Sequence, residues 1–217
     1  KILEVKKRKK TPILVGGTGL YFKALIDGLV NIPNIPIKFR EKIRSLHKSL
    51  GSKKFYSKLL KLDPLVKNKL KYSDTQRVIR AFEIKSFTKR SMYDWFKTTN
   101  SKYEDKDFFK LYIDYPREEL INRINLRSYD MFRQGAILEV KRFLRYKVPS
   151  SKTASKAIGL SEIKEYLNKK TEISKVIEKI SIKTRQYAKR QSTWGRGNMG
   201  DWNKIDPTSL NKFLKKI

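Results

Sequence analysis

The sequence is poorest in cysteine, histidine and acidic residues. None of its 217 residues is Cys, which excludes a disulfide framework, a thiolate zinc site and a cysteine nucleophile. One histidine, His47, argues against a histidine-rich metal site or a serine triad. No stretch approaches 18 consecutive apolar residues, so we expect no transmembrane helix. Residues 1–10 are basic but contain no apolar stretch of the kind found in a signal peptide. A cytoplasmic protein fits these absences.

The shortage of acids leaves a large positive charge. Asp and Glu number 21 against 52 Lys and Arg, which gives a net charge of +31. Codon bias in an AT-rich genome would raise Lys, but it should raise Glu as well. We therefore interpret the excess as the footprint of a polyanionic partner, first of all nucleic acid. A membrane surface is disfavoured as partner, because no single basic amphipathic helix dominates.

Strands alternating with helices predict an α/β fold. An apolar run at residues 12–15 precedes a glycine-rich turn and predicts a buried, parallel strand. Residues 108–114 and 201–205 are further strand candidates. We expect residues 1–35 to form the first part of an α/β core, residues 36–98 a helical insertion, and residues 99–217 the second part, with a basic C-terminal helix.

Turn and capping residues divide the helical regions. Helix-breaking prolines at residues 33 and 36 mark a linker. The helical pattern of residues 37–96 is interrupted near residues 50–52 and 71–74, where Ser73 or Asp74 can cap the next helix. Further helices are predicted at residues 117–146, with a break at Gly135, and at residues 161–167, 171–193 and from 207 onward. The chain opens on Lys1, in what reads as the end of a helix, so we expect residues to be missing upstream.

Residues 15–19, VGGTG, are the first candidate for chemistry. A strand, then glycines, then a helix N-terminus presents backbone N–H groups to an anion, and Thr18 adds a hydroxyl. The alternative is ordinary turn chemistry. The sequence is not a Walker A loop, because the Gly-Lys-Ser/Thr ending is absent.

Residues 74–83, DTQRVIRAFE, are the second candidate. Gln76, Arg77 and Arg80 can share one broad helix face. A planar amide and two guanidinium groups suit base edges and phosphates. The alternative is a solvated face with Val78 and Ile79 turned inward.

Residues 184–196, TRQYAKRQSTWGR, are the third candidate. Residues 175–196 carry seven basic side chains and one acidic one, and Tyr187 continues the apolar stripe that should face the core. Trp194 could stack on a base or only pack at a domain edge. Arg123 and Arg127, spaced i and i+4, could clamp a pyrophosphate or form one more surface pair.

These pieces, in this order, resemble the bacterial tRNA dimethylallyltransferases. The matching text is PILVGGTGLYFKALIDGL, DTQRVIRAFE, GAILEVKRFL, KAIGLSEI and TRQYAKRQSTWGRG, and the likeness covers essentially the whole chain. The resemblance implies a P-loop-kinase-like parallel sheet flanked by helices, with a helical insertion that grips the anticodon stem-loop of tRNA. It also implies transfer of a dimethylallyl group from dimethylallyl diphosphate to the exocyclic amine of the adenine 3′ of the anticodon, assisted by Mg²⁺, with the adenine flipped into a channel.

The resemblance assigns roles by position. Thr18 is expected in the catalytic channel beside the flipped adenine, and Arg123, Arg127 and Arg185 are expected to bind diphosphate. No residue is expected to ligate a metal. The residues expected to bind tRNA are Arg40, Gln76, Arg77, Val78, Ile79, Arg80, Lys156, Ala157, Ile158, Gly159, Leu160, Ser161, Lys189, Arg190, Gln191, Ser192, Thr193, Trp194, Gly195 and Arg196.

Two departures from the family pattern qualify this reading. The family usually has Arg at the position of Ser161 and often an aromatic residue at that of Leu160. Its P-loop and its general-base Asp lie upstream of the GGT strand, and neither is in this sequence. We therefore expect a chain that carries the acceptor half of the site and is inactive alone. We also expect it to be a monomer. Two alternatives stay open: a non-catalytic basic RNA-binding module, and an adenylate isopentenyltransferase. The helical insertion and the basic helix argue against the latter, because a mononucleotide needs neither.

Overall fold

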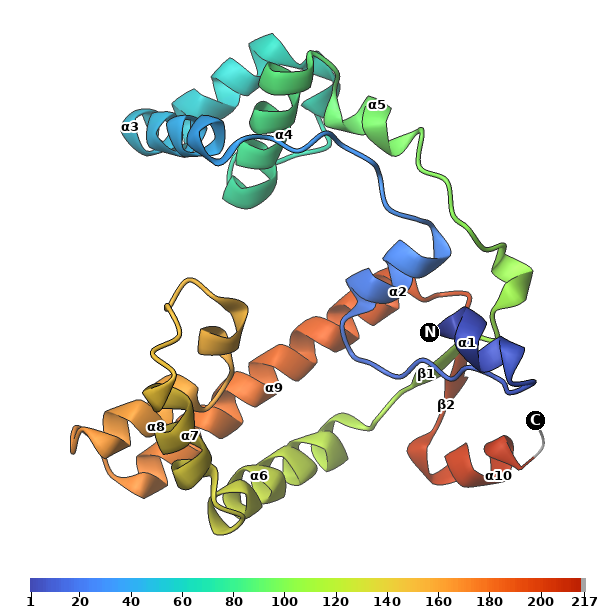
Figure 1. Ribbon diagram of the computed structural model, residues 1–217, viewed down its shortest axis with the longest axis vertical. Helices are drawn as coiled ribbons and strands as arrows, with labels where there is room; N and C mark the ends of the chain where they lie inside the picture. The colour runs from blue at the N-terminus through green and yellow to red at the C-terminus, as the bar shows by residue number, and fades with distance from the viewer. Residues whose placement is uncertain (216–217) are drawn as a thin grey trace. The chain divides into compact units, whose positions relative to one another are not determined.

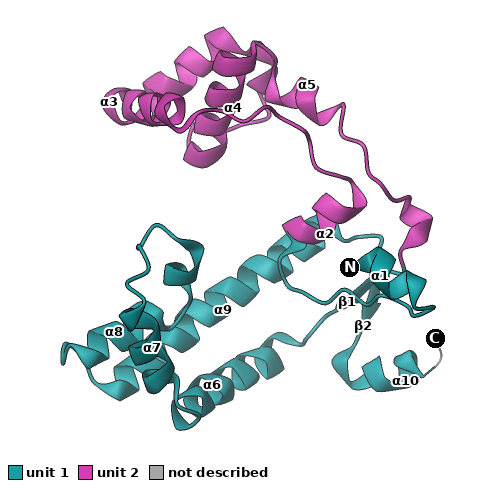
Figure 2. Ribbon diagram, in the orientation of Figure 1, with its two compact units in different colours: residues 1–19, 109–217 teal, residues 20–108 magenta. Residues whose placement is uncertain are grey.

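A computed structural model describes residues 1–215 and divides the chain into two compact units (Figures 1 and 2). Unit 1 combines residues 1–19 with the chain from residue 109 onward, and unit 2 is formed by residues 20–108. One unit is thus inserted into the sequence of the other. The described residues are mostly helical with a small parallel sheet, and the predicted α/β class is confirmed.

Two short parallel strands form the sheet of unit 1. β1 (Leu111–Ile113) pairs with β2 (Asn203–Ile205), and Ile113 lies opposite Ile205. An ion pair of 2.6 Å between Lys110 Nζ and Asp201 Oδ2 joins the segments that lead into the two strands. Both predicted strands are therefore confirmed, each over a shorter stretch than the sequence indicated.

Four helices build the core of unit 1. α6 (Arg117–Arg133) packs against α9 (Ile173–Asn198), while α7 (Ala136–Arg145) contacts α6 and α8 (Leu160–Leu167). Figure 1 shows α6 and α9 running side by side. The helices bury a small apolar cluster of Ala136, Val140, Ile163, Val176 and Ile180. The shorter elements are α1 (Ile2–Lys7), η3 (Thr153–Lys156), η4 (Pro207–Ser209) and α10 (Leu210–Leu214).

Glycines interrupt the helices where the sequence indicated. Gly135 has φ +93° and separates α6 from α7, as predicted. Gly51 has φ +71° and breaks α3 (Ile37–Leu62), also as predicted. Because L side chains rarely adopt such angles, glycine is the residue that allows the chain to turn at both points.

Unit 2 is a helical unit around its own apolar core. α3 packs against α4 (Thr75–Thr88), and the short helix η1 (Pro64–Val66) connects them. After α4 come α5 (Met92–Phe96) and η2 (Asp105–Asp107). α2 (Gly19–Ile26) begins at the last residue of the first segment of unit 1. The buried Asp63 accepts a 2.7 Å hydrogen bond from the Ser91 hydroxyl. The fully buried side chains of the core are Phe55, Leu59, Val66, Val78, Ala81 and Ile84.

Two predictions about local structure were wrong. Residues 12–15 form no strand, and Val15 is 92% exposed. A strand exists only through its pairing, and none of the described residues pairs with this segment. The basic helix α9 continues through residues 195–198, the stretch expected to end it near residue 193, and it ends at Asn198 with Gly195 buried within it.

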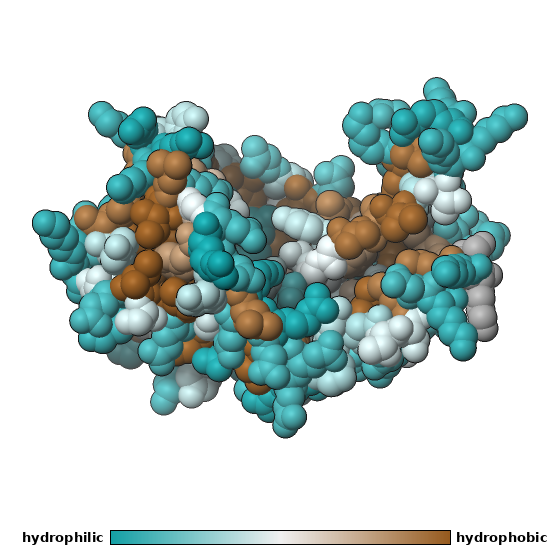
Figure 3. All heavy atoms as spheres, turned by 90° about the horizontal axis from the view of Figure 1, so that it is seen from below, coloured by the Kyte–Doolittle hydropathy of each residue, from teal (hydrophilic) through white to brown (hydrophobic). Residues whose placement is uncertain are grey.

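Apolar side chains also reach the surface. Figure 3 shows them between hydrophilic side chains on the face drawn there. No helix within residues 1–215 is both long enough and apolar enough to cross a bilayer.

Candidate nucleic-acid interface

In unit 1 the glycine-rich loop lies against the C-terminal half of α9. Gln191 Nε2 donates a 2.8 Å hydrogen bond to the carbonyl oxygen of Gly17. The hydroxyl groups of Thr18 and Tyr187 lie 3.5 Å apart. Tyr187 and Gln191 are spaced i and i+4, so both project from one side of the helix. Two motifs that are 169 residues apart in sequence thus form one site.

Glycine is required in this site because backbone and rings approach closely. A Cβ placed on Gly19 would overlap the indole ring of Trp194, and one on Gly195 would come within 2.8 Å of the Tyr112 ring. A Cβ on Gly17 would collide with the side-chain amide of Gln191. Gly17 and Gly19 therefore permit contact between loop and helix, whereas Gly195, which is buried, lets Tyr112 of β1 pack against α9 and contributes packing rather than a surface.

Aromatic and cationic groups flank this contact. Tyr187 is 41% exposed and is not part of the core stripe, which corrects the reading of its helical spacing. The Arg190 guanidinium lies 5.6 Å from the centre of the Tyr187 ring. Lys189 and Arg196 are exposed on the same helix. Stacking rings among cations suit a nucleic-acid chain.

The three arginines expected at diphosphate come from two helices that pack together. Arg123 and Arg127 are exposed on α6, and Arg185 is half-buried on α9. Arg123 donates a 2.9 Å hydrogen bond to the Tyr115 hydroxyl, and its guanidinium lies 4.8 Å from the centre of that ring. Tyr115 therefore holds Arg123 in place, a role that the sequence did not indicate.

A buried glutamate organises the loop before α8. Glu162 accepts hydrogen bonds from the Gly159 N–H at 2.9 Å and the Ser161 hydroxyl at 3.0 Å, and it pairs with Lys183. Burial raises the pKa of Glu162, but the hydrogen bonds from Lys183, Ser161 and Gly159 outweigh it and hold the pKa below the ordinary value. Gly159, at φ +102°, is itself buried, whereas Lys156, Ala157, Ile158 and Ser161 are exposed.

In unit 2 the start of α4 presents the second motif. Asp74 caps the helix, as predicted, by accepting from the Arg77 N–H, and it pairs with the Arg77 guanidinium at 2.9 Å. Gln76 and Arg77 are exposed. Val78 is fully buried, so its side chain does not form part of a binding surface as expected from the resemblance, while Ile79 is partly buried and packs against the core of unit 2.

Three arginines of unit 2 surround one buried carboxylate. Arg80 Nη1 lies 3.2 Å and Arg40 Nε 3.4 Å from Glu83 Oε2, while Arg44 Nε lies 3.8 Å from Oε1. The Glu83 side chain is 2% exposed. The sequence had indicated Arg40 and Arg80 but neither Arg44 nor Glu83, although Glu83 closes the DTQRVIRAFE motif and stands three residues after Arg80.

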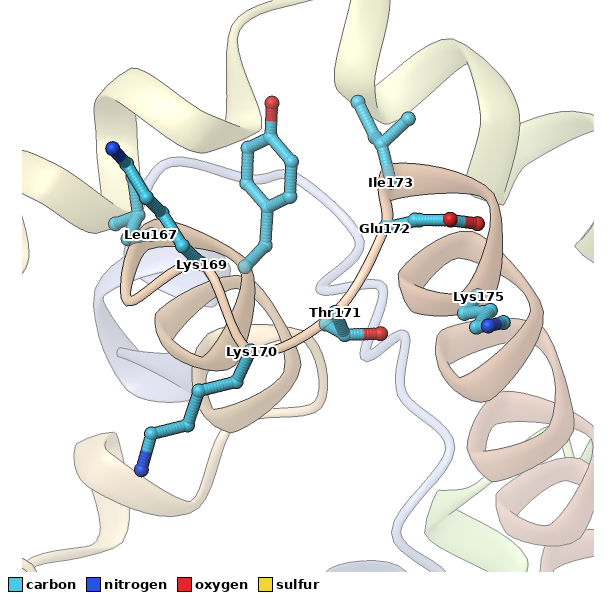
Figure 4. A pocket seen from close by; sticks show the side chains of 8 residues that line it. Leu167, Lys169, Lys170, Thr171, Glu172, Ile173 and Lys175 are labelled. Carbon is cyan, nitrogen blue, oxygen red and sulfur yellow. The ribbon is translucent and has the colours of Figure 1, made fainter.

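A depression in the surface of unit 1 lies elsewhere. It is formed at the connection from α8 to α9, where Lys170 and Thr171 occupy the short link and Ile173 opens α9 (Figure 4). Ile173 and Gln191 are separated by about 27 Å along the helix, at about 1.5 Å per residue. The depression is therefore not part of the loop–helix contact.

The described residues do not build a metal site of their own. Within residues 1–215, no three His, Asp or Glu side chains gather so as to hold a metal ion. Mg²⁺ usually binds through one or two carboxylates together with substrate phosphates.

Fold and surface together define the class: a strongly basic α/β protein with an inserted helical unit, each unit presenting arginines beside exposed polar groups. The family model of the IPP transferases matches residues 1–198, and the chain belongs to this family.

Curated relatives agree. The chain is 55% identical over its whole length to a tRNA dimethylallyltransferase of Pelagibacter ubique, of which it covers 69%. It is 37% identical to the tRNA dimethylallyltransferase of Rickettsia massiliae, of which it covers 60%.

Solved structures have the same fold. A eukaryotic dimethylallyltransferase acting on tRNA matches 98% of the chain at a TM-score of 0.75 and 28% identity, with 55% of its own length covered. The tRNA isopentenylpyrophosphate transferase of Bacillus halodurans matches 94% of the chain at a TM-score of 0.57 and 31% identity, with 63% of its length covered. The chain thus spans little more than half to about two thirds of these relatives.

Proposed function

We propose that this chain provides the tRNA-binding, acceptor side of a tRNA dimethylallyltransferase. The observation that carries the proposal is the contact of the glycine-rich loop with α9, which brings the Thr18 and Tyr187 hydroxyls together beside the Arg190 guanidinium. Two neighbouring hydroxyls offer donors and acceptors to an adenine edge, and the cations offer partners to its phosphates. Nothing favours a non-catalytic module or an adenylate isopentenyltransferase.

The reaction joins the exocyclic nitrogen of adenine to C1 of the dimethylallyl group. As the C–N bond forms, the C1–O bond to diphosphate breaks and the bonding pair leaves with the diphosphate, while the amine passes one proton to a carboxylate acting as general base. Arg123, Arg127 and Arg185 are proposed to stabilise the charge that gathers on the leaving diphosphate. Tyr115, which holds Arg123, limits the reorganisation that this requires.

Mg²⁺ would supply charge neutralisation to the diphosphate. Within residues 1–215, no group of His, Asp and Glu side chains would hold the ion by itself. A cytoplasmic location and a monomeric state complete the proposal.

Binding of an anticodon stem-loop tests the proposed function. We expect tighter binding of a stem-loop with adenine 3′ of the anticodon than of the same stem-loop with guanine there, because guanine carries an oxygen where adenine carries the amine. Fluorescence anisotropy with labelled stem-loops measures both affinities. Equal affinity for both stem-loops would contradict recognition of the acceptor base.

A further inference from the structure

The buried carboxylate of unit 2 does not neutralise its surroundings. Glu83 contributes one negative charge, while Arg40, Arg44 and Arg80 contribute three positive charges, so the cluster has a formal charge of +2. Within the described chain, Glu83 is the one acid at ion-pair distance from these arginines. The unpaired positive charge of this cluster favours the binding of an anion.

The arginines also remain accessible. Their side chains are 39%, 57% and 41% exposed for Arg40, Arg44 and Arg80, whereas Glu83 is covered. The Arg40 Nε atom is buried and makes no hydrogen bond. Glu83 thus faces the arginines from the protein side, and solvent reaches their outer edges.

Spacing along the helices fits the same geometry. Arg40 and Arg44 are spaced i and i+4 on α3, and Arg80 lies three residues before Glu83 on α4. Side chains at these spacings share a helix face. One carboxylate between two packed helices therefore gathers three guanidinium groups from both.

We propose that Glu83 is a positioning residue that fixes Arg40, Arg44 and Arg80 as a binding site for a backbone phosphate of RNA, with Arg44 as a phosphate contact. The inference rests on the proposed function, since the RNA is the tRNA substrate. An oriented guanidinium binds phosphate through paired N–H donors, and a carboxylate behind it holds that orientation. An acid thereby strengthens the binding of a polyanion.

The test uses the full chain and an anticodon stem-loop. Glu83→Gln removes one negative charge, so charge alone predicts tighter binding. Positioning predicts the reverse: affinity falls about tenfold, or about 1.4 kcal/mol, because the guanidiniums lose their fixed partner. Glu41→Gln is the matched control, since Glu41 is exposed on α3 and its replacement changes the net charge equally. We expect Glu41→Gln to bind as tightly as the parent, or more tightly.

A second pair of variants covers the case that Glu83→Gln fails to fold, which circular dichroism detects. Arg44→Ala should lower the slope of log affinity against log salt by about one unit and weaken binding. Lys42→Ala, which removes an exposed charge from the opposite face of α3, should change neither by as much. Unchanged binding by Arg44→Ala, or tighter binding by a folded Glu83→Gln, overturns the positioning role. If the parent chain itself binds no stem-loop, the proposed function fails instead.

Discussion

Replacing Gly19 by Ala tests whether the glycine-rich loop packs on α9. The new methyl group would overlap the indole ring of Trp194, so the loop or the ring must move. Overpacking costs about 1–3 kcal/mol. Because Gly19 is the first residue of α2 and does not lie in its middle, alanine gains little helix preference there. The net cost of about 1–3 kcal/mol should lower the Tm of a chain this long by about 2–12 °C.

Gly197→Ala is the matched control for this prediction. Gly197 also lies within a helix, α9, and a Cβ there would meet no atom within 4 Å. Because Gly197 is the next-to-last residue of α9, the same substitution should stabilise the chain slightly, by at most about 0.5 kcal/mol. Thermal unfolding followed by circular dichroism gives both values. If Gly19→Ala raises the Tm as Gly197→Ala does, the loop does not contact Trp194 and the assembled site is wrong.

Three further predictions address recognition and stability. Gln76→Ala should reduce the preference for the cognate anticodon loop over a scrambled loop by about 1–3 kcal/mol and leave the slope of log affinity against log salt unchanged. Arg80→Ala should instead lower that slope by about one unit. Affinities for both loops at several salt concentrations separate the two effects. Thr18→Val should weaken binding of the adenine stem-loop more than that of the guanine stem-loop, measured by anisotropy, because the valine offers no hydroxyl; an equal loss for both would contradict the role of Thr18. Glu162 has a lowered pKa, so its contribution to stability is present above the ordinary value of 4.5 and is lost as the pH falls through the folded value. Glu162→Gln should therefore be less stable than the parent at pH 7 in denaturant unfolding, with a difference that shrinks in acid; a difference that persists at the lowest pH would refute the ion pair.

Local signals predicted much of this architecture. Asp74 at a helix start and Gly51 and Gly135 at helix breaks depend on the residue itself and its immediate neighbours, so the sequence alone reveals them. The linker around residues 33 and 36 follows from proline in the same way.

Features that depend on distant partners were missed or wrong. The apolar run at residues 12–15 has the composition of a strand but lacks a pairing partner within the described chain. Tyr187 fits an apolar stripe by its helical spacing, yet its hydroxyl lies next to that of Thr18, which is 169 residues away in the sequence. Spacing reports which side of a helix a residue occupies, not which segment packs there.

The two buried glutamates show the same limit in the binding motifs. A glutamate within a basic motif reads as a solvated acid, because composition predicts exposure for charged residues. Glu83 and Glu162 are instead covered, and each pairs with cations from another element: Glu83 pairs with arginines of both α3 and α4, and Glu162, on α8, pairs with Lys183 of α9. Removing water from a carboxylate costs free energy unless cations and N–H groups replace it. Part of the positive charge of this chain therefore pairs with these buried carboxylates, and we propose that the exposed remainder binds a polyanion.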